Sequence, residues 1–300
     1  SILTKKILYW YDNNKRALPW RKKISQTKRE YYTLVSEFML QQTKVTTVIP
    51  YFNNFIRDIP NLTSLSKITD DKLLKYWEGL GYYSRVKNLK KTAQIVRRKF
   101  KGRLPITIDK LKTLPGIGDY TANAIMAIAF NKPFIPLDGN IERVIKRLLN
   151  LKLANEVSKE NLIKEKKILG TSTRSSDYAQ SLMEFGALVC KAKIPLCSQC
   201  PVTKDCKSFK KNDFEIIKQK KKKINKFYLV EVYKKNNQFL LIKNTKFNFL
   251  KNLKIFPMKE ISKPDNSMKS FNFKMSNMNM NVIIKFTKQK SVISDSSWID

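Results

Sequence analysis

The chain has 300 residues, 42% of them hydrophobic, and 60 lysines and arginines against 24 acidic residues give it a formal charge of +36. No histidine is present, which excludes a Ser-His-Asp triad, an imidazole general base and a histidine metal ligand. The positive charge favours a polyanionic partner, nucleic acid before an anionic membrane, although a lysine- and asparagine-rich background composition would raise the charge in the same way.

The N-terminal stretch "SILTKKILYWYDNNKRALPWR" has no continuous apolar segment and no small-residue cleavage site, so it does not predict a signal peptide. The sequence also contains no run of about 18 apolar residues, so we predict no transmembrane segment. We therefore expect a cytoplasmic protein without a membrane partner.

The first two hundred residues predict a mainly α-helical region, because apolar residues recur at helical spacing and strand patterns are scarce. A glycine pair at 79 and 81 separates two helices, and the extended piece "PFIPLDGN" (133–140) separates two others. The segments with helical periodicity are 29–58, 69–100, 107–114, 120–130, 141–151 and 175–190.

The character of the sequence changes near residue 215. The stretch "IKQKKKKINK" (217–226) is typical of a solvated basic linker. Beyond it, "FYLVEVYKKNNQFLLIKN" (227–244) alternates apolar and polar residues around a turn, which predicts a β-hairpin. All eight glycines precede residue 190, so the C-terminal part is a small, glycine-free domain that contains strands.

The stretch "LPGIGDYTANAI" (114–125) places Gly116 and Gly118 in a tight turn between two apolar helical segments. Glycine permits a positive φ and leaves its amide uncovered, and amides at the start of the next helix can bind phosphate without sequence preference. An ordinary helix–helix turn is the commoner meaning of two such glycines. The high positive charge and the apolar Ile117 favour a clamp on a DNA backbone.

All four cysteines fall within seventeen residues, in the pattern Cys190-x6-Cys197-x2-Cys200-x5-Cys206. Disulfides are not expected in a reducing compartment. Four thiolates without histidine suit a structural zinc ion or an iron–sulfur cluster. A zinc site usually has two CxxC pairs and this chain has one, so the spacing favours a [4Fe–4S] cluster.

Six segments between residues 6 and 210 resemble the helix–hairpin–helix DNA glycosylases with an iron–sulfur loop, and within them the adenine DNA glycosylases of the MutY family. In order they are "LPWR", "SEFMLQQTKVTTVIPYF", "WEGLGYYSRVKNL", "LPGIGDYTANAI", "PLDGNIERV" and the cysteine pattern. The resemblance implies a mainly α, two-lobed helix–hairpin–helix glycosylase fold with a [4Fe–4S] loop, an active site in the cleft between the lobes, and a small α+β Nudix-like C-terminal domain. The implied domains are an iron–sulfur cluster domain (1–22 and 135–210), a six-helix barrel domain with the hairpin (23–134), a basic linker (211–225) and a divergent Nudix-like lesion-recognition domain (226–300).

Tyr120 bears on the type of glycosylase that the resemblance implies. Endonuclease III, a near relative, is similar through the hairpin but has a catalytic lysine at this position. The lysine amine attacks the sugar and forms a Schiff base, which leads to strand cleavage. A tyrosine cannot form this intermediate, so the resemblance implies a monofunctional glycosylase that leaves an abasic site.

Two carboxylates have the catalytic roles in the implied chemistry. Asp138 opens a helix, where an N-cap aspartate is common and where the helix N-terminus favours the ionised form. In the family this aspartate stabilises the sugar cation formed as the glycosidic bond breaks, with Asn140 and Tyr120 as its neighbours. Glu37 lies next to an apolar helical stripe, where desolvation would raise its pKa. The family match makes Glu37 the acid that protonates N7 of adenine, so the two carboxylates divide their roles as in glycosidases.

Further side chains are carried over from the family's base-flipping turns and adenine pocket. The family fills the gap left by a flipped base from its "QQT" and "GLGYY" turns, and "LPWR" supplies pocket walls. The substrate and DNA contacts carried over are Trp20, Arg21, Gln41, Gln42, Leu80 and Tyr82, with Gly116 and Gly118 of the hairpin.

The C-terminal domain departs from the family in the loop that reads the lesion. The stretch "FLKNLKIFPMKE" (249–260) is similar to part of the family's Nudix-like domain, but the glutamate-rich Nudix motif is absent, so we expect no pyrophosphatase activity. The family's "FSH" recognition loop aligns with Met275-Ser276-Asn277. This loop keeps Ser276 as a candidate contact and lacks the aromatic residue and the histidine.

The resemblance therefore implies a monomeric, nucleoid-associated adenine DNA glycosylase of base excision repair. Its substrate would be adenine opposite 8-oxoguanine or guanine in double-stranded DNA. Two alternatives stay open: a mismatch-specific thymine or pyrimidine glycosylase, which can share the tyrosine, and a non-catalytic iron–sulfur DNA-binding module. The "SEFMLQQTK" stretch around Glu37 argues against the first alternative.

Overall fold

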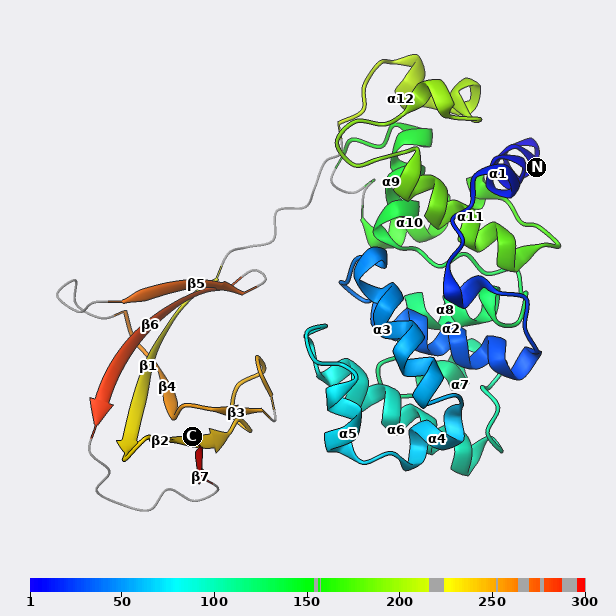
Figure 1. The fold of residues 1–300 in the computed structure, drawn as a ribbon. Coiled ribbons are helices and arrows are strands. Elements are labelled where there is room, and N and C mark those ends of the chain that lie inside the picture. Colours follow the sequence, from blue (N-terminus) through cyan, green and yellow to red (C-terminus); the bar gives the residue numbers. More distant parts are fainter. Residues whose placement is uncertain are drawn as a thin grey trace. The chain divides into compact units, whose positions relative to one another are not determined.

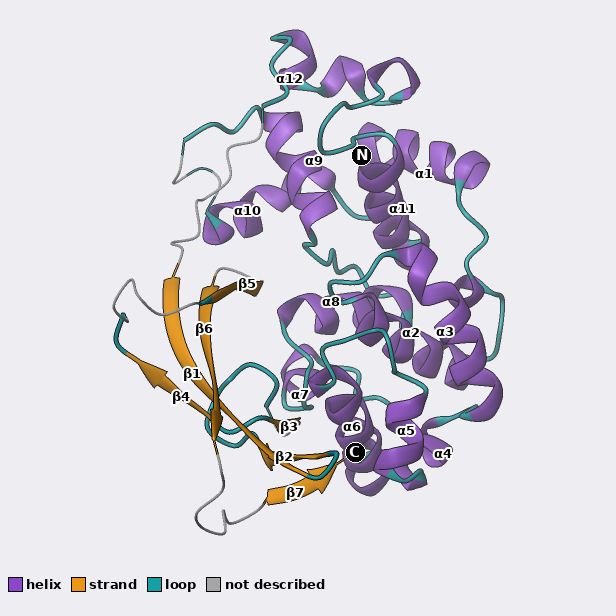
Figure 2. Cartoon of the chain, turned by 60° about the vertical axis from the view of Figure 1, so that its left-hand side comes forward, coloured by secondary structure: helices purple, strands orange, loops and turns teal. Residues whose placement is uncertain are grey.

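A computed structural model of the chain describes residues 1–153, 156, 158–215, 224–251, 253–263, 270–275, 278–287 and 296–299. The chain divides into two compact units, Ser1–Lys218 and Gln219–Asp300. In these described ranges the helices belong to the first unit and the strands to the second (Figures 1 and 2). None of the described helices has both the length and the apolar content that a bilayer crossing requires.

The first unit is built from twelve α-helices and four short 3₁₀ helices within its described residues. The α-helices are α1 (Ile2–Asn14), α2 (Gln26–Leu40), α3 (Val45–Asp58), α4 (Leu62–Lys67), α5 (Asp70–Lys75), α6 (Ser84–Lys99), α7 (Ile108–Lys112), α8 (Asp119–Ile128), α9 (Gly139–Leu149), α10 (Lys159–Glu165), α11 (Ser175–Leu188) and α12 (Lys207–Lys210). The 3₁₀ helices are η1 (Pro19–Arg21), η2 (Lys166–Leu169), η3 (Cys197–Gln199) and η4 (Thr203–Asp205).

Helices α2 to α8 enclose the first of two hydrophobic cores in this unit. On α6 the buried residues Val86, Leu89, Ala93 and Val96 recur every three or four positions, which places them on one face of the helix. Helix α2 contributes an equally buried stripe and begins at Ser25, whose side chain accepts a hydrogen bond from the backbone of Lys28. The charged helices at the surface are therefore held by their apolar inner faces.

The second core joins the N-terminal helix α1 to α9 and α11, which lie far away in the sequence. Helix α11 packs against α1, α8 and α9, and Trp10 meets Phe185 edge to face at 5.6 Å. In Figure 1 these helices lie together at one end of the unit, and those of the first core lie at the other. The division into lobes 1–22 with 135–210 and 23–134 stays a prediction.

The second unit contains strands β1 to β7 within its described residues. They are β1 (Ile224–Lys235), β2 (Gln238–Lys243), β3 (Lys254–Ile255), β4 (Met258–Ile261), β5 (Phe271–Met275), β6 (Met278–Thr287) and β7 (Ser296–Ile299). The strand order is β3-β2-β1-β6-β5, with β4 also paired to β1 and β7 to β2.

Strand β1 organises this sheet. It pairs in parallel with β6, from Ile224 opposite Met278 onwards, and antiparallel with β2 and β4. The β1–β2 pair, with Lys235 opposite Gln238, confirms the hairpin predicted from the alternating pattern. The described residues of the second unit form strands and no helix, so only the β part of the expected α+β domain is observed.

Two features predicted for this region lie wholly or partly outside the described residues. Of the predicted linker 211–225, the structure describes 211–215, which follow α12, and 224–225, with which β1 begins. Ser276 and Asn277 of the predicted recognition loop fall outside the described ranges, so the role assigned to Ser276 stays a prediction.

Candidate active site

A cavity of about 520 Å³ opens in the first unit, between η1, the end of α2, the start of α8 and α9, and the middle of α11. Its walls come from both hydrophobic cores, since α2 and α8 belong to the first and α9 and α11 to the second. The predicted site residues that line it are Trp20, Arg21, Glu37, Gln41, Gln42, Tyr120, Asp138 and Asn140.

Glu37 is a buried carboxyl group on α2, with 4% of its surface exposed. Its pKa is raised to about 7, mainly by burial and also by the charge of Asp138, while hydrogen bonding with Tyr120 and the charge of Arg21 act in the opposite direction. Among the described residues no group hydrogen-bonds to the buried Oε2 of Glu37. The cavity therefore contains a carboxyl group that is half protonated near neutral pH and has one oxygen available to a ligand.

Tyr120 lies in the first turn of α8, beside Glu37. Burial and the nearby charges of Glu37 and Asp138 raise the pKa of its hydroxyl well above its ordinary value. The hydroxyl therefore keeps its proton, and this residue offers no amine to a sugar.

Asp138 is the N-cap residue of α9. Its Oδ1 accepts a hydrogen bond from the backbone N–H of Ile141, and its Oδ2 accepts one from Asn140 Nδ2, both at 2.7 Å. Burial nevertheless raises the pKa of Asp138, because desolvation outweighs these hydrogen bonds. The helix N-terminus favours the ionised form of Asp138, as expected, and burial is the larger effect.

Asn140 connects Asp138 to the cysteine loop through Arg143. Arg143 Nη2 donates to Asn140 Oδ1 at 2.9 Å, and its Nε donates to the carbonyl of Cys190 at 2.7 Å. Gly186 lets α11 approach closely here, because a Cβ at this position would lie 2.6 Å from Asn140 Cβ. The site and the first cysteine are therefore joined by three consecutive polar contacts.

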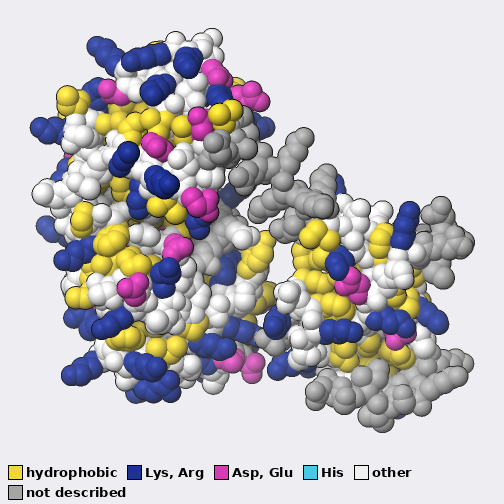
Figure 3. All heavy atoms as spheres, turned by 180° about the vertical axis from the view of Figure 1, so that it is seen from behind, with side chains coloured by type: hydrophobic (Ala, Val, Ile, Leu, Met, Phe, Trp, Pro, Cys, Tyr) yellow, Lys and Arg dark blue, Asp and Glu magenta, His cyan; other side chains and the backbone are white. Residues whose placement is uncertain are grey.

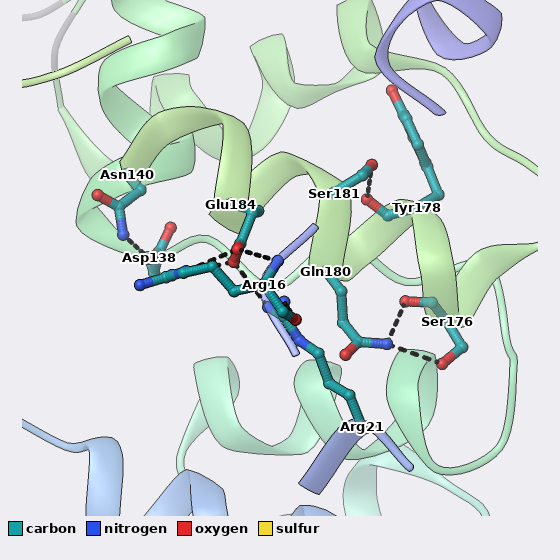
Figure 4. A network of polar contacts seen from close by, with 9 residues as sticks. All are labelled: Arg16, Arg21, Asp138, Asn140, Ser176, Tyr178, Gln180, Ser181 and Glu184. Carbon is teal, nitrogen blue, oxygen red and sulfur yellow. Dashed lines mark hydrogen bonds and ion pairs between the residues drawn. The ribbon is translucent and has the colours of Figure 1, made fainter. Parts of the chain in front are cut away.

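Glu184 on α11 is a second fully buried carboxylate in the cavity wall. Its Oε1 accepts from Arg16 Nε at 2.6 Å and its Oε2 from Arg21 Nη2 at 2.9 Å (Figure 4). Burial alone would raise the pKa of Glu184, but the two arginines outweigh burial and hold it below its ordinary value. The cavity thus contains an ionised, paired carboxylate in addition to Glu37.

The sequence did not predict Glu184, Arg16 or Gln180 as site residues. Arg16 lies just outside the "LPWR" motif, and Gln180 lies one turn before Glu184 on α11. An acidic residue inside the apolar run "SLMEFGALVC" was the available signal, because a buried carboxylate requires a partner.

Two predicted DNA contacts, Gln42 and Tyr82, lie on turns near one end of α2 and have unusual backbone geometry. Their φ values are 57° and 48°, in the left-handed region that non-glycine residues rarely adopt. Tyr82 is 59% exposed and does not line the cavity. Leu80 is 6% exposed and packs in the first core, and its assignment as a DNA contact stays a prediction.

The hairpin between α7 and α8 carries both predicted phosphate-binding glycines on the surface. Gly116 has a φ of +80°, as predicted for a tight turn. Gly118 differs from the prediction, since it is the N-cap of α8 with an ordinary φ of −96°. Lys112 lies beside the turn and pairs with Asp119 at 2.6 Å, so the turn has a lysine next to its exposed amides.

We expect Gly116→Ala to lower the free energy of unfolding by about 1–3 kcal/mol, because the new Cβ would lie 2.7 Å from Phe38 Cε1 at a positive φ. Gly118→Ala is the matched control, since a Cβ there meets open space. Its free energy of unfolding should stay within about 1 kcal/mol of the parent value. Urea unfolding measures both, and equal losses would contradict this account of the turn.

The four cysteines surround one small apolar cavity, which Arg147 and Val189 also line. Arg147 Nη1 lies 3.4 Å from Cys190 Sγ. The pKa of Cys200 is raised to about 12, mainly by burial and also by the neighbouring cysteines. Among the described residues, no three acidic or cysteine side chains converge so as to hold a metal ion. The sulfur atoms therefore border a shared space without meeting at one point.

Basic side chains are spread over the face of the first unit drawn in Figure 3 without forming one patch. Figure 3 shows lysine and arginine side chains scattered over the face drawn there, with fewer acidic ones between them. The charge therefore does not by itself locate a binding face. Its position has to be inferred from the hairpin, the exposed turns and the cavity.

The first comparison with known proteins defines the class. Residues 35–167 match the family described as HhH-GPD superfamily base excision DNA repair protein. The chain is also similar to the solved structure of a thermostable thymine-DNA glycosylase, with 26% identity, a TM-score of 0.62 and coverage of 70% of this chain and 96% of that one. The fold is that of a helix–hairpin–helix DNA glycosylase, with a C-terminal sheet added.

Relatives that are 38–39% identical narrow the class to one family. The chain is 38% identical over 258 residues to the adenine DNA glycosylase of Buchnera aphidicola subsp. Baizongia pistaciae (strain Bp), an alignment that covers 84% of this chain and 72% of that protein. It is 39% identical over 209 residues to the adenine DNA glycosylase of Homo sapiens, covering 67% of this chain and 38% of the human protein. The chain belongs to the adenine DNA glycosylase family.

Proposed function

We propose that the chain is a monofunctional adenine DNA glycosylase of base excision repair. It hydrolyses the N-glycosidic bond of adenine mispaired with 8-oxoguanine or guanine in duplex DNA and leaves an abasic site. The observation that carries this proposal is the pair of Glu37 and Asp138 in one cavity, the first with a pKa of about 7 and a free oxygen, the second with two hydrogen-bond donors.

The hydrogen bonds divide the two roles. Burial raises the pKa of both carboxyl groups, and the charge of Asp138 also raises that of Glu37. The state in which both groups are ionised is therefore disfavoured relative to the state in which the pair shares one proton. Asp138 accepts two N–H donors, which favour its ionised form, whereas Glu37 Oε2 has no donor among the described residues. The proton therefore resides on Glu37 and the negative charge on Asp138.

The chemistry follows from this division. Glu37 donates its proton to N7 of adenine, and the electrons of the C1′–N9 bond move to the departing base. Positive charge develops on the sugar, where the Asp138 carboxylate stabilises it. Water then attacks C1′, loses a proton and leaves the abasic site. Tyr120 hydrogen-bonds with Glu37 and cannot form a Schiff base, so no strand cleavage follows.

The remaining cavity residues suit a flipped base. Trp20 is fixed edge-on against Phe52 at 5.2 Å and supplies an aromatic wall. Arg21 is oriented by Glu184, and its Nε is buried without a hydrogen-bond partner in the described part of the chain. An unpaired donor in a cavity is typical of a group that hydrogen-bonds to a ligand.

The pH dependence of base release tests the acid assignment. A pKa of about 7 for Glu37 predicts a rate that is constant below that value and falls about tenfold per pH unit above it, because the deprotonated form cannot donate. Single-turnover rates from about pH 5 to pH 9 would show the decrease. Glu37→Gln should retain little activity and no such titration, and an unchanged profile in this variant would contradict the assignment.

The four cysteines are proposed to hold a [4Fe–4S] cluster. The four cysteines border one common cavity, and four thiolates without histidine suit an iron–sulfur cluster. Burial and mutual repulsion raise the pKa of Cys197, Cys200 and Cys206, so their thiolates need a bound cation to persist. The cluster, when bound, supplies that charge and ties the loop together.

Purified protein should contain about four iron atoms per chain and show broad visible absorbance. Replacing Cys200 with Ser should lower the iron content and the thermal midpoint, because the loop loses its common ligand. Elemental analysis measures the iron and the zinc content of the same sample. A colourless protein with one zinc ion per chain would contradict the cluster.

Duplex DNA is the proposed partner, and the described features that support it are the hairpin amides, the exposed Tyr82 and the positive charge. The second unit is proposed to be the Nudix-like domain that reads 8-oxoguanine. Its sheet and the alignment of Ser276 with the family's recognition loop support this proposal, and a monomer is the expected state.

A further inference from the structure

Arg85 is a buried arginine, 6% exposed, in the first turn of α6. Its guanidinium lies within hydrogen-bond distance of six oxygen atoms, five of them backbone carbonyls. Nη1 contacts Phe38 O (3.1 Å), Met39 O (2.8 Å), Gln41 O (2.5 Å) and Thr43 Oγ1 (3.2 Å), and Nη2 contacts Leu80 O (3.0 Å) and Gly81 O (3.1 Å).

No carboxylate offsets this cation among the described residues. Burial lowers the pKa of Arg85, and its Nε is buried without a partner. The guanidinium lies over the rings of Trp77 and Tyr82, at 5.4 Å and 5.6 Å from their centroids. A buried charge is costly unless many groups compensate it, and here the compensation comes from backbone carbonyls and aromatic faces.

Two of those carbonyls, Phe38 O and Met39 O, belong to the last turn of α2, and the other three belong to two separate turns. The first turn, 41–43, ends α2, whose last carbonyls have no partner within the helix and form the negative end of its dipole. The second turn, 79–82, precedes α6. Gln42 on the first turn and Tyr82 on the second both have positive φ, a strained geometry that persists only when neighbouring contacts hold it. The planar fork of Arg85 contacts both turns at once.

We propose that Arg85 is a positioning residue that holds the 41–43 and 79–82 turns as one unit. Gln42 and Tyr82 then enter the duplex together and keep the target adenine unstacked. This inference rests on the proposed function and adds a mechanism for the flipping step.

The proposal predicts where the loss appears when Arg85 is replaced. Flipping a base costs a few kcal/mol in a paired duplex and less where the base is already unpaired. Damage to the two turns should therefore slow release of a paired adenine and spare an adenine that is already unstacked. Damage to the acid should slow both.

The test uses Arg85→Lys in the full chain. Lysine keeps the positive charge, but its single nitrogen cannot contact both turns as the two nitrogens of the guanidinium do. Single-turnover adenine release is measured on two duplexes, with adenine opposite 8-oxoguanine and with adenine opposite an abasic site. We expect a loss of about 10- to 100-fold on the first and under about 3-fold on the second. 2-Aminopurine at the target should also show a smaller rise in fluorescence on binding.

Two controls separate this effect from general damage. Leu65→Ala leaves a cavity in the same core and changes neither turn. It should lower the thermal midpoint and change the rate of adenine release by the same factor on both duplexes. Glu37→Gln should slow release from both duplexes alike. Equal losses of Arg85→Lys on both duplexes would overturn the inference and leave the function standing, whereas no release by the parent protein from either duplex would overturn the function itself.

A second measurement keeps Arg85 in place and applies even if its variants fail to fold. Gln42→Ala and Tyr82→Ala are made singly and together. If the two turns act as one unit, the double variant should release a paired adenine about as slowly as the slower single variant. Fold-losses that multiply would show two independent turns and overturn the inference.

Discussion

We expect Glu37→Gln to lower the single-turnover rate of adenine release by about 10²- to 10⁴-fold, because the variant retains the shape of the side chain and loses its acidic proton. Duplex affinity should stay within about threefold of the parent value, since the substitution changes no exposed charge on the DNA-binding side. Rapid-quench assays and fluorescence anisotropy measure the two quantities. Parent-like release would remove Glu37 from the mechanism.

The same substitution should increase stability at alkaline pH. The unfolded chain ionises Glu37 near its ordinary pKa of 4.5 and the folded chain only near 7, so the group destabilises the fold progressively as pH rises between these values. The advantage of Glu37→Gln in unfolding free energy should grow by about 2–3 kcal/mol from about pH 5 to about pH 8. If the difference in unfolding free energy between Glu37→Gln and the parent does not change with pH, Glu37 is solvated.

The second large effect is expected for Asp138→Asn, which should lower the rate by about 10²- to 10³-fold. Asparagine caps a helix about as well as aspartate, so it can still accept the backbone N–H of Ile141. It removes the negative charge that faces the sugar cation and leaves Asn140 without its carboxylate acceptor. Activity should fall while the thermal midpoint changes little.

Asp138→Ala is the matched control for the cap. It removes the charge and the capping oxygen together, and the lost cap should cost about 1 kcal/mol of stability. The two variants should therefore share the loss of activity and differ in stability. If Asp138→Asn keeps parent-like rates while Asp138→Ala loses them, the carboxylate acts as a cap and not as a catalytic charge.

That the proposed catalytic residues share one cavity could be predicted because they lie in motifs that are local in sequence. Glu37, Tyr120 and Asp138 each sit at the start or inner face of a helix in a recognisable stretch, and the fold brings them to one cavity. The sequence also gave the correct direction for the pKa of Glu37, since an apolar stripe implies desolvation. It could not give the direction for Asp138, where burial and hydrogen bonds compete.

The remaining parts of the site depend on contacts between distant segments. Glu184 is a buried, paired carboxylate only because Arg16 and Arg21 contact it across more than 160 residues of sequence, and no local sequence pattern predicts that contact. Arg85 resembles any surface arginine of a basic helix until its carbonyl partners are known. Leu80 was assigned as a DNA contact from its motif, and its place in the first core depends on packing that the motif does not show.

The most direct measurement is single-turnover base release from duplexes carrying A:8-oxoguanine, A:G, A:T or T:G, each with and without alkali. The account predicts release from A:8-oxoguanine and A:G, with strand breaks only after alkali because Tyr120 cannot form a Schiff base. Release of thymine from T:G in place of adenine, or breaks without alkali, would contradict it.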